Sequence, residues 1–326
     1  MRNRSVGGWS IERLIRDLSG NLSNNFHVKF RYNSFRSKGI FKRFSDVLLA
    51  PLYQGDINHI SGDVHYLCYL LNRRKTILTI HDCVMMERLS GIKRFIFWLF
   101  WLWIPYKRSG IIVAISEATK SQLIKYLKCD PTTIKVIYDN VSPEFKPQPK
   151  KFNSNNPRIL HIGTGENKNL LRHIEAVSDI LCHFVIVGNI SDYIKNKLYE
   201  KKIDFTNISQ LTNEEILEQY RLCDILLFCS TYEGFGLPII EAQSVGRAVI
   251  TSNKWSMPEV AGEGACIVDP TNILEINFNL KNIINNEKYR KILIKNGLEN
   301  VKRFSLEECS RQYSELYYSL LEIKSS

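Results

Sequence analysis

The sequence predicts an α/β protein built from two Rossmann-like, doubly wound domains that face each other across a cleft. Three observations support this: short β-rich runs alternate with helical stretches, one polar, proline-bearing segment interrupts the alternation, and the alternation then resumes. Such alternation favours parallel sheets with helices on both faces. At 326 residues the chain is long enough for two domains of ordinary size.

The expected strands are runs rich in β-branched and aromatic residues. In the first half they are His27–Tyr32, Asp56–Ile60, Lys75–Ile80, Ile111–Ser116 and Thr133–Tyr138, with helices at Ser10–Leu18 and Ala118–Leu127. In the second half they are Arg158–Gly163, His183–Gly188, Asp224–Cys229 and Ala248–Ser252, with further helices after Ile273.

The domain boundaries follow from the interruption "SPEFKPQPKKFNSNNP", which has the composition of a linker. We expect an N-terminal domain over residues 1–145, a linker over 146–157 and a C-terminal domain over 158–304. A C-terminal helix, residues 305–326, is expected to pack back on the N-terminal domain.

Composition narrows the class of protein. The chain is 44% hydrophobic and 24% charged, which is typical of a globular protein. Its 8 cysteines show no C-x-x-C spacing, which indicates buried thiols in a reducing cytosol and not a zinc site. No apolar signal-peptide region precedes Trp9. The net charge of +11 suits an anionic partner, which could be nucleotide phosphate, nucleic acid or an acidic membrane surface.

The segment "STYEGFGLPIIEAQSVGRAVITSN", Ser230–Asn253, follows an expected strand. Ligands of parallel α/β sheets bind beyond the carboxyl ends of strands. Pro238 is well placed as the first residue of a helix, and the two preceding glycines, Gly234 and Gly236, let backbone approach a ligand closely.

Two carboxylates flank this turn. The amides from Phe235 to Ile239 form an anion site at the helix start. Glu233 can reach a polar group bound there, and Glu241 could accept two hydrogen bonds from a vicinal diol such as a ribose. On spacing alone, a plain helix N-terminus with acidic residues matching its dipole remains equally open.

The pattern E-G-F-G-L-P-x-x-E, followed by "GRAVITSN" and "MPEVAGEGACIVDP", resembles the C-terminal signature of the family 4 retaining glycosyltransferases. These are GT-B enzymes, with two Rossmann-like domains and a nucleotide-sugar donor in the cleft. The similarity extends through "VAISEATKSQL", "VIYDNVSPEF", "IGTGENKNL", "INHISGDVHYL" and "TIHD", and so covers most of the chain.

The resemblance implies roles for individual residues. Glu233 would contact the donor sugar, Lys168 would neutralise the diphosphate, and His81 would face the reacting carbon; these three are the implied catalytic residues. The implied donor-binding residues are Gly163, Thr164, Lys168, Phe235, Gly236, Leu237, Glu241, Gly7 and Gly8. Considered alone, a lysine such as Lys168 is more often a solvated residue at a helix start, and a histidine such as His81 is more often structural. Many relatives place an arginine shortly before the lysine, but here that stretch reads Gly165, Glu166 and Asn167.

The activity implied by the resemblance is hexosyl transfer, with retention, from a nucleotide-diphosphate sugar to a glycan or lipid-linked acceptor. Bacterial surface polysaccharide assembly, of O-antigen or capsule, is the expected setting. No D-x-D occurs in the chain, so we expect no metal and no other cofactor. A nucleotide-sugar epimerase or a phosphorylase on the same fold remains an alternative. So does a basic nucleic-acid-binding protein, although no nucleic-acid motif is present and no such partner is expected.

A hydrophobic stretch, Phe95–Pro105, has basic residues on both sides. It is too short to span a bilayer, which needs about 20 residues. Aromatic residues with basic flanks suit a helix lying in the membrane interface, and a buried core helix is the alternative. The expected localisation is cytoplasmic. If the stretch lies in the interface, the protein acts on the inner face of the cytoplasmic membrane.

The start of the chain lacks an expected feature. A Rossmann-like domain opens with a central strand followed by a glycine loop, yet only Met1–Arg4 precede the loop "SVGG". These four residues are too few and too polar for a buried parallel strand. We therefore expect either that the natural protein begins further upstream or that the first domain is defective.

Overall fold

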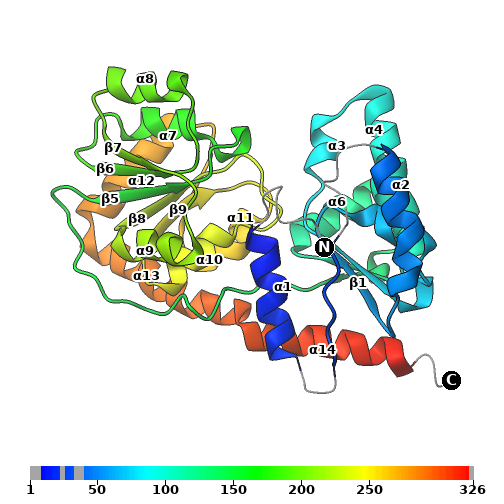
Figure 1. The fold of residues 1–326 in the computed structure, drawn as a ribbon. Helices are drawn as coiled ribbons and strands as arrows, with labels where there is room; N and C mark the ends of the chain where they lie inside the picture. The colour runs from blue at the N-terminus through cyan, green and yellow to red at the C-terminus, as the bar shows by residue number, and fades with distance from the viewer. Residues whose placement is uncertain (1–8, 23–25, 33–39, 323–326) are drawn as a thin grey trace. The chain divides into compact units, whose positions relative to one another are not determined.

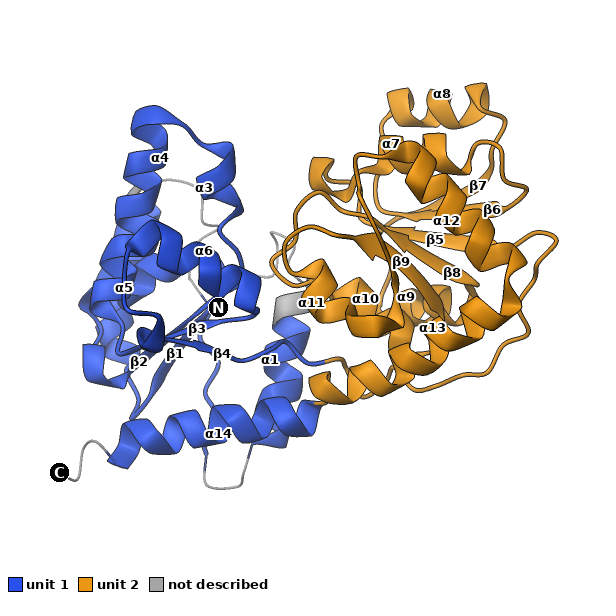
Figure 2. Ribbon diagram, turned by 180° about the vertical axis from the view of Figure 1, so that it is seen from behind, with its two compact units in different colours: residues 1–140, 306–326 blue, residues 141–305 orange. Residues whose placement is uncertain are grey.

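The computed structural model describes residues 9–22, 26–32 and 40–322. The chain forms two compact units, shown in blue and orange in Figure 2: unit 1 contains residues 1–140 and 306–326, and unit 2 contains residues 141–305. The expected linker, residues 146–157, falls within unit 2 in this division. Lys150 of that segment forms an ion pair with Asp224 of the same unit.

Unit 1 contains a parallel sheet with the strand order β1-β2-β3-β4. Every residue of β2 is buried, as expected for an inner strand of a parallel sheet covered on both faces. The strands are β1 (Asn58–Ser61), β2 (Thr76–Ile80), β3 (Ile111–Ala114) and β4 (Ile134–Val136).

The helices of unit 1 pack around this sheet (Figure 1). They are α1 (Trp9–Asn21), α2 (Ile40–Leu49), η2 (Ala50–Tyr53), η3 (His65–Leu70), η4 (Arg73–Lys75), α3 (Val84–Arg88), α4 (Gly91–Phe97), η5 (Trp98–Trp103), α5 (Ile104–Arg108), α6 (Glu117–Leu127), η6 (Pro131–Thr133) and α14 (Leu306–Glu322).

The C-terminal helix α14 packs against the unit 1 sheet through its tyrosines. Tyr313 and Tyr317 share a hydrophobic cluster with sheet residues. His59 bridges helix and sheet, because Nδ1 lies 2.7 Å from Tyr317 Oη and Nε2 lies 2.7 Å from Thr79 Oγ1. Burial lowers the pKa of His59 to about 4, so the bridging imidazole is neutral at physiological pH.

The hydrophobic stretch is helical through α4, η5 and α5, and η5 is a π-helical segment. Pro105 explains the irregularity, because it has no N–H to donate to the carbonyl four residues earlier. That carbonyl belongs to Trp101, and it accepts instead from His65 Nδ1 at 2.7 Å. Leu102 is buried, whereas Phe95 and Phe100 are exposed, so the stretch is partly core and partly surface.

Unit 2 contains a parallel sheet with the order β10-β9-β8-β5-β6-β7. The chain builds outward from β5 to β6 and β7, then crosses to the other side of β5 for the remaining strands. The boundary between β5 and β8 is therefore the topological switch point of the sheet. The strands are β5 (Arg158–Ile162), β6 (His183–Val187), β7 (Asp204–Ile208), β8 (Ile225–Phe228), β9 (Ala248–Ser252) and β10 (Cys266–Val268).

Helices cover both faces of the unit 2 sheet (Figure 1), and α7 packs on α12 while α10 packs on α13. They are η7 (Glu166–Lys168), α7 (Leu170–Val177), α8 (Asp192–Glu200), α9 (Asn213–Leu222), α10 (Leu237–Ser244), α11 (Met257–Ala261), η8 (Gly262–Gly264), α12 (Ile273–Asn285), α13 (Glu287–Asn300) and η9 (Val301–Phe304). The predicted α/β class, with two parallel sheets flanked by helices, is confirmed.

Some expected strands differ. His27–Tyr32 is not a strand; most of its side chains are exposed, so its β-rich composition has no sheet to pack against. The short or polar strands β7 and β10 were not expected from the sequence. The proposed gap at Met1–Arg4 lies outside the described residues. Among the described residues, no helix combines the length and apolar character needed to cross a bilayer.

Candidate active site

The turns that follow β5 and β8 meet at the switch point of the unit 2 sheet. The two strands are paired neighbours, so their carboxyl ends lie at the same edge. Thr231 N–H donates to Asn167 O at 2.8 Å, and Asn167 Nδ2 donates to Tyr232 O at 3.0 Å. These bonds tie the turn that carries Lys168 to the turn that carries Glu233.

Lys168 and Glu233 form an ion pair at this point, with Nζ 2.6 Å from Oε1. The ammonium also lies 4.7 Å from the centre of the Phe228 ring, which adds a cation–π contact. Only 22% of the lysine side chain and 14% of the glutamate side chain are exposed. The structure thus fixes one cation and one carboxylate side by side at the expected ligand edge.

The glycine loop after β5 is shaped around the lysine. Gly163 has a φ of 89°, and a Cβ there would lie 3.0 Å from Cε and Cγ of Lys168. Thr164 packs on Gly188, where a Cβ would lie 2.8 Å from Thr164 Cγ2. Side chains at either glycine would therefore displace the loop.

The helix α10 begins at Leu237, one residue before the expected start, with Pro238 following it. Its N-cap is Gly236, whose φ of 109° places it in the left-handed region that glycine adopts without strain. The Phe235 side chain is buried against Phe304, with ring centres 5.6 Å apart. Phe235 can therefore offer a ligand its backbone but not its ring.

Glu241 lies in the second turn of α10, whereas its distance from Pro238 in the sequence had placed it in the first turn. It is 6% exposed, and Tyr220 Oη donates to its Oε2 at 2.6 Å. Tyr220 is itself fully buried and packs edge-on against Phe145. The tyrosine thus fixes the orientation of this carboxylate.

His81 follows β2 in unit 1 and is held from two sides. Its Nε2 lies 3.0 Å from Ser61 Oγ, and its Nδ1 lies 3.9 Å from Asp139 Oδ2. Burial, followed by the nearby His65 and His59, lowers the pKa of His81 to about 3. Burial raises the pKa of Asp139 to about 7. His81 is therefore a neutral hydrogen-bonding group, and Asp139 is an acidic neighbour that the sequence did not reveal.

Asn169 is a second residue that sequence reasoning missed. It is buried with a φ of 63°, and its Nδ2 donates to Cys229 O at 3.0 Å and to Pro270 O at 2.7 Å. One amide therefore holds the loops after β5, β8 and β10 together. The signal in the sequence was the asparagine directly after Lys168, because asparagine adopts the left-handed backbone conformation more readily than most residues.

A buried histidine pair lies under the glycine loop. His161 Nε2 donates to Gly163 O at 2.7 Å, and its Nδ1 lies 2.9 Å from His173 Nδ1. Since Nε2 of neutral His161 carries the proton, His173 Nδ1 donates to it. Burial lowers the pKa of His161 to about 4. The pair therefore supports the glycine loop through hydrogen bonds and places no charge beneath it.

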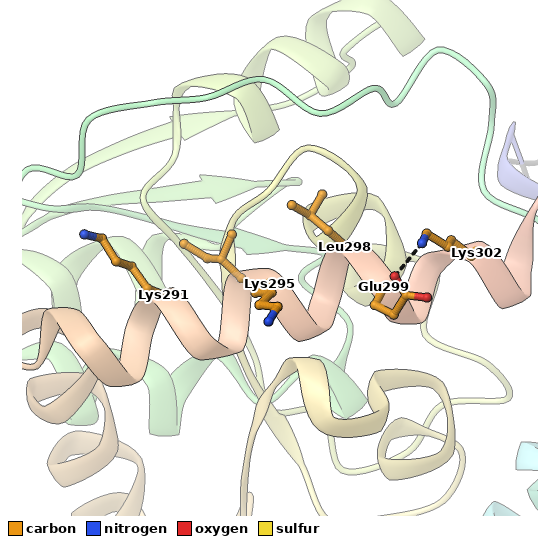
Figure 3. A pocket seen from close by; sticks show the side chains of 6 residues that line it. Lys291, Lys295, Leu298, Glu299 and Lys302 are labelled. Carbon is orange, nitrogen blue, oxygen red and sulfur yellow. Dashed lines mark hydrogen bonds and ion pairs between the residues drawn. The ribbon is translucent and has the colours of Figure 1, made fainter.

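Two of the predicted donor-binding residues, Gly7 and Gly8, lie outside the described residues. A hollow of about 440 Å³ lies along α13 and η9 (Figure 3), away from every predicted site residue. It is lined by Lys291, Ile294, Lys295, Leu298, Glu299 and Lys302.

Comparison with known proteins places this arrangement in a class. The model for glycosyl transferases group 1 matches residues 142–300, and the model for glycosyltransferase family 4 matches residues 19–145. Together they span most of both units. These matches show that the chain belongs to glycosyltransferase family 4, whose fold class is GT-B.

Individual relatives agree. O-antigen chain mannosyltransferase B of Escherichia coli is 34% identical over 110 residues, which are 34% of this chain and 29% of that protein. An uncharacterised glycosyltransferase of Methanocaldococcus jannaschii is 27% identical over 75% of this chain and 68% of its own length. The matched region therefore spans under a third of the first relative. Anabaena HepE, solved with UDP and glucose, shares the fold with a TM-score of 0.79, at 16% identity over 98% of each chain.

Proposed function

We propose that the protein transfers a sugar from a nucleoside-diphosphate donor to a glycan or lipid-linked glycan, in the assembly of a bacterial surface polysaccharide. The single observation that carries the proposal is the Lys168–Glu233 pair at the switch point of unit 2, where α/β sheets bind their ligands. The O-antigen mannosyltransferase among its relatives supports the setting.

In this proposal each charged side chain contacts a different part of the donor. The leaving diphosphate gains negative charge as the glycosidic bond breaks, and Lys168 and the positive N-terminal end of the α10 dipole stabilise that charge. Glu233 accepts hydrogen bonds from sugar hydroxyls. Glu241, oriented by Tyr220, accepts hydrogen bonds from the ribose. Because a fixed ammonium and a helix N-terminus carry the neutralisation, the proposed reaction requires no metal.

His81 fits the role of a neutral partner to the transferred sugar. Its lowered pKa means that the imidazole is neutral at physiological pH, so it would offer the sugar a hydrogen bond and no charge. It can donate or accept one hydrogen bond, with its orientation set by Ser61 and Asp139. Following the family, we propose that transfer retains the anomeric configuration.

We further propose contact with an anionic membrane through unit 1. Phe95 and Phe100 are exposed beside the basic ends of the helical stretch. The neighbouring α2 adds the exposed Phe41 and Phe44, and Arg43 of the same helix lies 4.7 Å from the Trp101 ring. Exposed aromatic side chains and interspersed cations are the features of an interfacial surface. Such contact would bring the enzyme to a lipid-linked acceptor.

Binding and product analysis test the proposal. A nucleotide sugar at 100 times its dissociation constant should stabilise the protein by about 2.7 kcal/mol in a thermal-shift screen. The screen is run with and without EDTA, and equal shifts are expected. NMR of the product should show the anomeric configuration of the donor. No stabilisation by any nucleotide sugar, combined with salt-sensitive binding to RNA or DNA, would favour the nucleic-acid alternative instead.

A further inference from the structure

Trp255, in the loop after β9, has an unusual backbone. Its φ is 55°, in the left-handed region that bulky residues rarely occupy. Glycine would adopt this conformation without strain. Outliers of this kind persist where the surrounding structure enforces them, and they gather at ligand sites. A tryptophan at this position, where glycine would be unstrained, therefore indicates that the indole ring has a function.

The indole is held in place but not covered. Its Nε1–H donates to Thr231 O at 3.0 Å, and its ring centre lies 4.9 Å from that of Tyr232 at a tilt of 56°. Tyr232 is 8% exposed and forms the support, whereas 39% of Trp255 remains exposed. An aromatic side chain that is held at one end is thus partly exposed to solvent.

The loop that carries Trp255 is hydrogen-bonded to the loop that carries the candidate sugar-binding residue Glu233. The next residue, Ser256, is buried, and its Oγ lies 3.0 Å from Glu233 O and 2.7 Å from Phe235 O. The loop that carries Trp255 is therefore hydrogen-bonded to residues before and after Glu233 in the chain. Both belong to unit 2, so the arrangement depends on one unit alone.

We propose that the exposed face of Trp255 is a stacking platform for a sugar ring. A pyranose is amphipathic: its C–H face suits the electron-rich face of an indole, while its hydroxyls suit a carboxylate such as Glu233. The platform takes the transferred sugar of the donor and helps determine which sugar is accepted. This inference rests on the proposed function, which supplies the nucleotide sugar.

The test separates stacking from loop support. Trp255→Gly removes the ring but suits the backbone, and Trp255→Phe keeps a ring but loses the bond to Thr231. Affinities for UDP, UDP-glucose, GDP and GDP-mannose are measured by calorimetry, with turnover and melting temperature alongside. Tyr193→Ala, which removes an exposed ring on α8 of the same unit, is the matched control.

For Trp255→Gly we expect roughly 3- to 10-fold weaker binding of the nucleotide sugar that wild type binds, with unchanged affinity for the free nucleotide and an unchanged melting temperature. Trp255→Phe should retain most of the affinity. A rise in acceptor KM alone would assign the platform to the acceptor sugar. Equal losses for nucleotide and nucleotide sugar with a lowered melting temperature, or no loss at all, would overturn the proposal. Wild type that no nucleotide sugar stabilises in the thermal-shift screen would refute the proposed function, and the platform with it.

Discussion

The pairing of Lys168 with Glu233 allows a test that separates catalysis from structure. Lys168→Met leaves a carboxylate in a partly buried position, where the Asn167 amide is its remaining hydrogen-bond donor among the described residues, with Nδ2 3.3 Å from the same Oε1. Exposed ion pairs contribute about 0.2–1 kcal/mol, and breaking a fully buried pair costs about 3–5 kcal/mol. With side chains 22% and 14% exposed, we expect a loss of about 1–3 kcal/mol in unfolding free energy.

Glu233→Gln in the Lys168→Met background removes the unpaired charge, so the double variant should recover part of that stability. Activity should behave differently. Loss of one group that stabilises a developing anion lowers the rate by roughly 10²–10³, and removing the glutamate cannot restore it. The four proteins of this cycle are compared by circular-dichroism melting and by release of nucleoside diphosphate.

A matched control is available in the same unit. Lys201 Nζ lies 2.5 Å from Glu175 Oε2, but both side chains are more exposed. Lys201→Met should change stability by less than about 1 kcal/mol and leave turnover unchanged. If the double variant recovered turnover along with stability, the pair would be structural. Wild-type turnover in either single variant would remove both residues from the active site.

Three other perturbations probe the support of the site. Burial lowers the pKa of His161 from 6.5 to about 4, so between these values the unfolded chain binds a proton that the folded protein does not. The free energy of unfolding should therefore fall as the pH drops below 6.5, by about 2 kcal/mol at pH 5. Urea unfolding of His161→Gln should show a smaller loss between pH 7 and pH 5. Asn169→Asp removes both donors to buried carbonyls and should lower unfolding free energy by about 2–4 kcal/mol, and an unchanged melting temperature would contradict the tether. Phe95→Ser with Phe100→Ser should abolish sedimentation with anionic vesicles at an unchanged melting temperature, whereas Trp98→Ser should destabilise the fold, because its Nε1 donates to Tyr126 O at 2.9 Å.

The fold was predictable where strands are buried on both faces. Residues Ile225–Phe228 and Ala248–Ser252 are continuous apolar or β-branched runs, and every one of their residues is buried. Asp204–Ile208 was missed because an edge strand is half exposed and its sequence is correspondingly polar. His27–Tyr32 has strand-like composition, but strand formation also requires a partner, which composition does not report.

The site was predictable only in part, for a similar reason. The spacing of Glu233 and Glu241 is local, so a sequence motif records it. The contacts of Asn169 reach carbonyls 60 and 101 residues away, and a linear pattern carries no trace of such pairings. The same applies to Pro105 and His65: the proline predicts an unsatisfied carbonyl, but only the fold shows what satisfies it.

The position before Lys168 provides the last prediction. The family resemblance leads one to expect an arginine shortly before Lys168, but that stretch reads Gly165, Glu166 and Asn167. Asn167 donates to Tyr232 O and to Glu233 Oε1, so it serves as a tether and carries no charge. Neutralisation of a diphosphate must then depend more heavily on Lys168. Asn167→Arg should add a cation and increase affinity for a free nucleoside diphosphate several-fold at low salt, with the gain shrinking as salt rises. In the Lys168→Met background, Asn167→Arg should restore part of the nucleotide affinity, because it replaces the lost positive charge. Turnover should recover less, because the new cation does not have the position of the lysine ammonium. If Asn167→Arg left nucleotide affinity unchanged at low salt while the protein stayed folded, the diphosphate would not lie at this turn, and the roles proposed for Lys168 and Glu233 would fall together.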